Sequence, residues 1–155
     1  MKKITPQRLK NIALYYLDRF DACGEKLKSV LMRRIQKAML AGDEVSPEAT
    51  EWVEEIVGEM KRLGYVNDRR FCENKVRLYL QAGKSNRYIM GKLCEAGLDS
   101  DMIRSYLPDD ELTQARIFVQ KKHLGKDFQK DLAKLARAGF SYDIAQKVLK
   151  EDSNV

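Results

Sequence analysis

The chain has 155 residues, of which 44% are hydrophobic and 34% are charged, and its formal net charge is +6. This composition is sufficient for a folded core. A membrane-spanning helix needs about 18 consecutive apolar residues, and every apolar stretch of this sequence is much shorter. The chain starts Met-Lys-Lys and lacks the apolar stretch of a secretory signal, so we expect a cytoplasmic protein that does not bind membranes.

Amphipathic helices are predicted from the first residues onward. Apolar side chains recur at helical spacing in residues 9–20 and again in residues 27–38. A third helix is expected to start at Ser46 as its N-cap, with Pro47 in the first turn. It should end at Gly64, which can adopt the positive φ of a C-terminal cap. Because no long stretch alternates apolar and polar residues, the sequence predicts an all-α protein.

A Gly-Lys-Ser sequence at residues 83–85 matches the end of a nucleotide-binding loop. Such a loop also needs a glycine five residues before the Gly-Lys pair, where this chain has Leu78, and it must follow a β-strand. Residues 69–80 instead place their apolar side chains at helical spacing. We therefore predict a turn between two helices, in which the glycine ends one helix and the lysine or serine begins the next.

The second half of the chain contains an internal repeat. Residues 83–107 align with residues 125–149 without a gap, and eight positions are identical. In both segments an Ala-Gly pair is followed by an apolar residue, which gives two matching corners at residues 96–98 and 138–140. A fixed offset of this length is typical of stacked helical repeats. The identical pairs are Gly83/Gly125, Lys84/Lys126, Lys92/Lys134, Leu93/Leu135, Ala96/Ala138, Gly97/Gly139, Asp101/Asp143 and Leu107/Leu149.

This repeat predicts the domain organisation. We expect an all-α fold of three tandem three-helix repeats, stacked into an elongated, curved array of the solenoid type. The predicted boundaries are residues 1–64 for a longer, diverged first repeat, 65–107 for the second and 108–151 for the third. A disordered tail is predicted at residues 152–155.

The reactive side chains do not form a recognisable catalytic or metal site. Cys23, Cys72 and Cys94 are far apart in the sequence and are predicted to be small core residues. His123 has no second ligand nearby and is predicted to lie at a solvated helix end. We therefore expect no enzymatic activity, no bound metal and no cofactor.

Charge is unevenly distributed along the chain. Residues 1–42 contain ten Lys or Arg and three acidic residues, whereas residues 43–68 contain two and eight. Residues 69–107 are basic again, with eight against four. This pattern predicts a basic surface for an anionic partner and one acidic helix.

Four stretches resemble the RecX family of bacterial regulatory proteins: residues 64–71 (GYVNDRRF), the Gly-Lys turn at 83–84, and the corners at 97–98 and 139–140. That family has a Gly-Tyr-hydrophobic-Asp-Asp-x-x-Phe signature at the opening of its second repeat, followed by such a turn and such corners. The resemblance covers nearly the whole chain.

The chain departs from the family pattern at three places. Asn67 replaces the first Asp of the signature, and residues 22–25 (ACGE) replace a Ser-containing helix start. Ala96 and Ala138 stand where a basic residue usually precedes the corner glycine. Because Asn caps helices as well as Asp does, the first change should leave the fold intact, whereas the lost basic residues bear on binding.

We interpret the signature residues as structural. Asp68 or Asn67 is expected to cap the following helix, Phe71 to pack inward, and Tyr65 to close the corner as a hydrophobic staple. The predicted structural residues are Gly64, Tyr65, Asp68, Phe71, Gly97, Gly139 and Phe140.

The resemblance implies a regulator that binds the RecA recombinase filament on DNA. Such a protein lies in the groove of the filament and inhibits strand exchange, ATP hydrolysis and co-protease activity. A curved helical stack suits this task because it presents one long surface that can follow a filament. We expect a monomer, with single-stranded or double-stranded DNA as a further candidate partner.

Basic side chains are the candidate contacts to the RecA filament or DNA. Lys26, Arg33 and Lys37 follow one another at helical spacing on one face. Lys84 and Arg87 lie at a helix start, where positive charge opposes the helix dipole and therefore has no role in helix stability. The predicted partner-binding residues are Lys26, Arg33, Arg34, Lys37, Lys75, Arg77, Lys84, Arg87, Lys121 and Lys122.

Other functions remain open at this point. The first alternative is a helical-repeat protein that binds DNA directly without a recombinase partner, and Asn86 with Arg87 would then be the place for base reading. A scaffold for an unrelated protein ranks third, and an enzyme ranks last.

Overall fold

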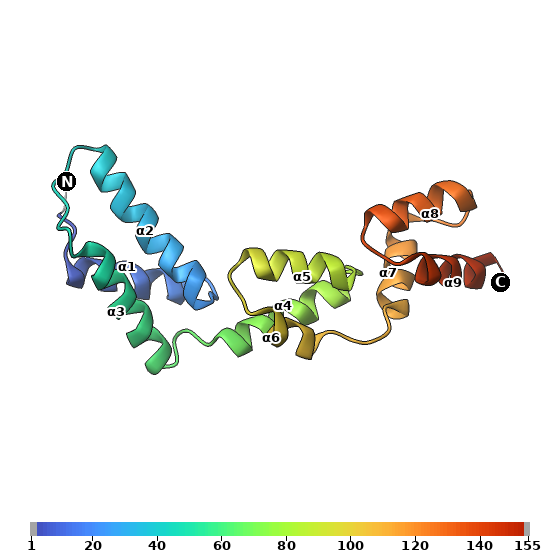
Figure 1. The fold of residues 1–155 in the computed structure, drawn as a ribbon, viewed down its shortest axis with the longest axis horizontal. Helices are drawn as coiled ribbons and strands as arrows, with labels where there is room; N and C mark the ends of the chain where they lie inside the picture. Colours follow the sequence, from blue (N-terminus) through green and yellow to red (C-terminus); the bar gives the residue numbers. More distant parts are fainter. Residues whose placement is uncertain (1–2, 154–155) are drawn as a thin grey trace. The chain divides into compact units, whose positions relative to one another are not determined.

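The structure is a computed structural model that describes residues 3–153 (Figure 1). Within this range the regular structure consists of nine α-helices and no β-strand, which confirms the all-α fold class. The helices are α1 (Pro6–Arg19), α2 (Gly24–Leu40), α3 (Ala49–Arg62), α4 (Asp68–Gln81), α5 (Asn86–Glu95), α6 (Ser100–Tyr106), α7 (Leu112–Lys122), α8 (Phe128–Arg137) and α9 (Tyr142–Ser153).

The chain divides into two compact units, and the division falls inside α4. The first unit ends at Phe71 and the second begins at Cys72. The predicted boundaries of the three repeats therefore differ from this division, because residues 65–71 of the second predicted repeat belong to the first unit and the rest of that repeat shares the second unit with the third repeat. The repeat boundaries remain a prediction.

The first unit has a core formed by α1, α2 and α3. Leu9, Leu31 and Val53, one from each helix, are completely buried. The predicted acidic helix is α3, and its carboxylates pair with both neighbours. Glu59 accepts a hydrogen bond from Lys10 of α1 at 2.8 Å, and Glu54 pairs with Lys28 of α2. The reversal of charge along the sequence thus becomes ion pairing within this unit.

The core of the second unit includes a cluster from α7, α8 and α9. Ala115, Leu135 and Ala145 are buried there, and the rings of Phe118 and Phe140 meet edge to face with their centroids 5.7 Å apart. Aromatic pairs of this geometry stabilise a core beyond the area that they bury. This cluster holds the end of α8 in place beside α7 and α9.

The offset of 42 residues recurs in the secondary structure. Helix α8 starts and ends 42 residues after α5, and α9 starts 42 residues after α6. Gly97 and Gly139 have φ of 93° and 100°. The next residues, Leu98 and Phe140, each donate a backbone hydrogen bond of 3.1 Å to the carbonyl five residues earlier and are buried. Both corners are therefore helix ends of the Schellman type.

Two predictions at the ends of α3 were wrong. Helix α3 begins at Ala49 and has Glu48 as its N-cap residue, because Ser46 forms a separate turn in which its Oγ accepts from the Glu48 N–H at 3.2 Å. At the other end Tyr65 is 53% exposed and does not pack as a staple. Val66 packs inward instead, because it is the residue whose N–H returns to the carbonyl of Met60.

Two further predictions need correction. Cys23 and Cys72 are buried, but Cys94 is exposed because it lies on the outer side of α5. Helix α9 extends to Ser153, so the first two residues of the predicted disordered tail are helical. The other two, 154–155, lie outside the described residues.

Further sequence predictions concern His123, metal binding and membrane-spanning helices. His123 is exposed at the C-terminus of α7, with a left-handed φ of 53°. Among the described residues, groups of three His, Cys, Asp or Glu side chains that could hold a metal ion do not occur. The same part of the chain contains no helix with the length and apolarity required to cross a bilayer.

Candidate partner-binding surface

The Gly-Lys-Ser turn joins α4 to α5, as predicted. Ser85 is the N-cap of α5, and its Oγ accepts a hydrogen bond from the Tyr88 N–H at 3.1 Å. The same hydroxyl donates to the carbonyl of Ala138 at 2.8 Å and is completely buried. A hydroxyl that is committed in this way cannot reach a nucleotide-bound metal ion, so this turn has a structural role.

Asn86 makes hydrogen bonds within the protein through both its side chain and its backbone N–H. Its side-chain amide donates to the carbonyl of Pro108 at 2.8 Å, and its Oδ1 accepts from the buried Gln114 at 2.8 Å. Its backbone N–H donates to Glu111 at 2.7 Å. Because base reading requires an amide that is available to the base edges, Asn86 does not fit the base-reading role considered for it.

Asn67 and Asp68, at the two positions where the family signature has Asp, have different partners. Asn67 caps α4, since its Oδ1 accepts from the Arg70 N–H at 3.0 Å. Asp68 instead accepts from the N–H of Gly24, the first residue of α2, at 2.8 Å, and its other oxygen lies 3.9 Å from the Lys61 ammonium. Asp68 thus acts over 44 residues of sequence on the start of the helix that carries the first basic set.

Four of the predicted contact residues lie on α2. Arg33, Arg34 and Lys37 are exposed, and Lys26 is partly buried. Beside Arg33 the surface has a shallow hollow of about 420 Å³. The structure therefore presents three exposed cations within little more than one helical turn, which can meet an anionic surface together.

Lys84, in the turn before α5, faces the first turn of that helix. Its ammonium lies 4.8 Å from the centre of the Tyr88 ring, and Lys92 approaches the same ring at 5.8 Å. Tyr79 meets the Tyr88 ring edge to face, with centroids 5.7 Å apart. Cation–π contacts of this kind give Lys84 a structural partner in addition to any external one.

The remaining predicted contacts are dispersed over α4 and α7. Arg77 is exposed and donates to Asn74 at 2.9 Å, while Lys75 is half-buried on the same helix. Lys121 donates to the carbonyl of Ala82 at 3.4 Å, which matches a structural role, and Lys122 is exposed. Of these four residues, Lys122 lines a hollow that shares Arg137 with the groove that Arg87 lines.

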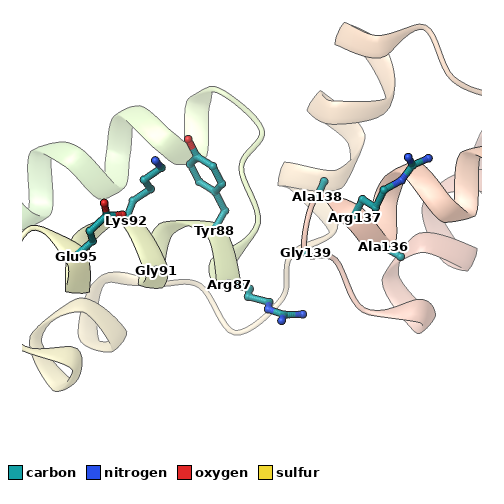
Figure 2. Close-up of a pocket in the computed structure, with 9 residues that line it drawn as sticks. All are labelled: Arg87, Tyr88, Gly91, Lys92, Glu95, Ala136, Arg137, Ala138 and Gly139. Atoms are coloured by element: carbon teal, nitrogen blue, oxygen red, sulfur yellow. The ribbon is translucent and has the colours of Figure 1, made fainter.

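A groove of about 600 Å³ lies between α5 and the end of α8 (Figure 2). Three cations lie along it, namely Arg87, Lys92 and Arg137, and the single acidic lining residue is Glu95. Figure 2 shows Arg87, Tyr88, Gly91, Lys92 and Glu95 on α5, opposite residues 136–139 at the end of α8. A second hollow of about 350 Å³ adjoins it through Arg137 and is lined by Phe118, Lys122, Lys134 and Arg137.

The predicted partner-binding residues include Arg87 and Lys122 but not the other cations of these hollows, which are Lys92, Lys134 and Arg137. Lys92 and Lys134 are an identical pair of the internal repeat, so the alignment already contained a signal for them. Arg137 carried no such signal, because its counterpart in the second repeat is Glu95. The groove itself exists only because the corner at Gly139 packs against the start of α5.

Comparison with known proteins identifies relatives along nearly the whole chain. A curated protein named Regulatory protein RecX from Myxococcus xanthus is 35% identical, over 99% of this chain and 89% of its own length. A protein of the same name from Legionella pneumophila is 32% identical over 79% of this chain and 89% of its own length. No protein-family model matches the chain.

A solved structure has the same fold. The crystal structure of RecX from Lactobacillus salivarius matches with a TM-score of 0.73, covering 97% of both chains at 20% identity. At this level of identity the match establishes the helical fold.

Proposed function

Because this chain belongs to the RecX family of regulatory proteins, we propose that it binds the RecA recombinase filament on DNA and inhibits it. The observation that carries this proposal is the similarity to Regulatory protein RecX of Myxococcus xanthus over 99% of the chain. The restrained activities are strand exchange, ATP hydrolysis and co-protease activity. We propose that the protein acts in the cytoplasm as a monomer, by binding in the filament groove and without a catalytic step.

The distribution of cations supports a binding mode with many contacts. Arg33, Arg34 and Lys37 are exposed on α2, and Arg87 with Arg137 lies along the groove of the second unit. Each exposed charge contributes little by itself, so a stable complex with a filament needs several of them together. Such a distribution of cations suits binding to a polymer that presents anionic groups repeatedly along its length.

The direct test measures ATP hydrolysis and strand exchange by RecA on single-stranded DNA as the full-length protein is added. Both rates should fall. Replacing Arg33 and Lys37 together by Ala should weaken inhibition, whereas the control Arg62→Ala, which removes an exposed cation from α3, should not. Unchanged rates at a several-fold molar excess of the wild-type protein would disprove the proposal.

Direct DNA binding is a second candidate, supported by the cluster of exposed cations on α2. With Asn86 occupied, such binding would involve phosphates and would be independent of sequence. Titration of a duplex without RecA, at several salt concentrations, tests it. Each phosphate contact should contribute about 0.9 to the slope of log affinity against log salt. Tight binding without any effect on RecA would favour this candidate over inhibition of the filament.

A further inference from the structure

We propose that the groove between α5 and the end of α8 binds an extended acidic segment of a protein partner. The inference deepens the proposed function, because it gives the second unit a peptide-binding site through which a protein partner is held. It rests on the shape of the groove and on the charges along it. It also rests on the fact that the side chains that nucleic acid would need already contact other parts of the protein.

The shape fits a peptide backbone. Four of the lining residues are small, namely Gly91 of α5 and Ala136, Ala138 and Gly139 at the end of α8. Where the lining lacks long side chains, an extended main chain can approach closely, and a volume of about 600 Å³ accommodates a few residues. A DNA duplex is too wide to enter such a groove and would contact its rim only.

The charges favour carboxylates at one end. Arg87 and Arg137 carry guanidinium groups, which can bind a carboxylate through two parallel hydrogen bonds. Glu95 lies eight residues beyond Arg87 on α5, and Figure 2 shows it at the end of the groove away from Arg137. A bound segment should therefore place its acidic residues near the two arginines and avoid them near Glu95.

Single-stranded nucleic acid fits less well. Protein sites for unpaired bases use an open aromatic face, but the Tyr88 ring is already contacted by Lys84 and Lys92 and forms a T-shaped pair with Tyr79. The neighbouring amide of Asn86 is used by Pro108 and Gln114. The groove thus supplies cations without a platform for bases.

The adjoining hollow extends the positive surface. It shares Arg137 with the groove and adds Lys122 and Lys134. A segment that leaves the groove past Arg137 therefore meets two further cations. Binding should tighten when acidic residues continue in that direction.

The first experiment uses fluorescence anisotropy with the full-length protein. The probe is a fluorescein-labelled peptide of alternating Glu and Ala, and the matched peptide has Gln in place of every Glu. The Glu peptide should bind and the Gln peptide should not. Replacing Arg87 and Arg137 together by Gln should raise the Kd for the Glu peptide about tenfold, since two charge-assisted contacts are lost. The control Lys147→Gln, an exposed cation of α9 outside the groove, should leave it unchanged.

A second variant tests the groove by shape instead of charge. A Cβ at Gly91 would meet no atom within 4 Å, and this residue is exposed within α5. Gly91→Leu should therefore fold, gain helix propensity and block the groove. The control Gly58→Leu in α3, where a Cβ also has open space, should bind the peptide normally. Normal binding by Gly91→Leu would overturn the proposal.

A nucleic-acid arm separates the two classes of partner. A labelled oligo-dT that binds more tightly than the Glu peptide, displaces it, and loses affinity with Arg87→Gln and Arg137→Gln would make the groove a nucleic-acid site and overturn the proposal. Circular dichroism confirms that each variant is folded. If the peptide does not bind, the proposed inhibition of RecA is still tested separately, because the effect of the wild-type protein on RecA is measured in an independent assay.

Discussion

The N-terminus of α2, in the first unit, and the N-terminus of α5, in the second, each receive a carboxylate from a residue at the start of a later helix. Asp68 accepts from the N–H of Gly24, and Glu111 accepts from the N–H of Asn86. The local support differs. The N-cap residue of α2 is Cys23, whose thiol is a weak hydrogen-bond acceptor, whereas the N-cap of α5 is Ser85, whose hydroxyl accepts from the Tyr88 N–H.

The start of α5 has several supports that α2 lacks. Ser85 binds both its own helix and the carbonyl of Ala138, and Gln114 binds the carbonyl of Lys84 as well as Asn86. A carboxylate from a distant residue can therefore reinforce a weak local cap, and it then becomes the main support of the helix start. We expect the α2 start to be sensitive to one long-range contact and the α5 start to tight packing.

The largest expected effect comes from the glycine that precedes the α5 start. Gly83 has φ of 77°, and a Cβ there would lie 2.9 Å from Ile117 and 3.0 Å from the backbone nitrogen of Phe118. Gly83→Ala should cost about 3 kcal/mol of unfolding free energy, from left-handed strain and overpacking against α7. Denaturation by guanidinium, followed by far-UV circular dichroism, measures this loss.

A matched glycine separates the two causes. Gly42 has φ of 86°, but a Cβ there would meet nothing within 4 Å. Gly42→Ala should cost only the conformational strain, about 1 kcal/mol. Equal losses for the two variants would mean that packing against α7 contributes nothing at Gly83.

The next effect distinguishes the two carboxylates. Asp68→Ala should cost about 1–2 kcal/mol, because it removes the cap of α2, whereas Glu111→Ala should cost about 0.5 kcal/mol, because the other contacts of α5 remain. Trp52 is the only tryptophan of the chain and packs against the core of the first unit. Its fluorescence therefore reports the Asp68 effect, and circular dichroism reports the Glu111 effect.

A rescue variant sharpens the assignment. Cys23→Ser gives α2 the kind of N-cap that Ser85 gives α5, so it should recover about 0.5–1 kcal/mol in the Asp68→Ala background. In the wild-type background Cys23→Ser should add less to the free energy of unfolding, since Asp68 already accepts a hydrogen bond from the start of α2. The absence of any recovery would show that Asp68 does not act through α2.

The smallest effect concerns two partly exposed ion pairs, one in each unit. The Lys10 ammonium lowers the pKa of Glu59, and the Arg116 guanidinium lowers the pKa of Glu151, in each case mainly through a hydrogen bond. A carboxyl group whose pKa is lowered in the folded state adds stability above its unfolded pKa, and this stability is lost as the pH falls through the folded pKa. Because both pairs are partly exposed, the contribution should be small.

The pH dependence of Tm checks this point with Glu59→Gln and Glu151→Gln. Each variant should be less stable than the wild-type protein at neutral pH. The difference should shrink as the pH falls below the ordinary pKa of glutamate, about 4.3. A difference that widens with acid would contradict the assigned ion pairs.

Local sequence patterns predicted those features that depend on neighbouring residues. Helical spacing, the turn at residues 83–85 and the corner glycines could be recognised because a helix and its end are determined within a few positions. The same local reasoning was wrong for Tyr65, because its exposure depends on which residue after the corner returns to the core.

The sequence by itself therefore determined an all-α chain with repeated corners and a family resemblance, since periodicity and short motifs express local preferences. Only the tertiary structure decided that Asp68 holds the start of α2, that Ser85 binds the carbonyl of Ala138, and that a basic groove lies between α5 and α8. These contacts join residues that are 44 and 53 positions apart. Such contacts arise when helices from distant parts of the sequence pack together. The spacing of apolar residues within one helix does not specify which distant residue will contact that helix.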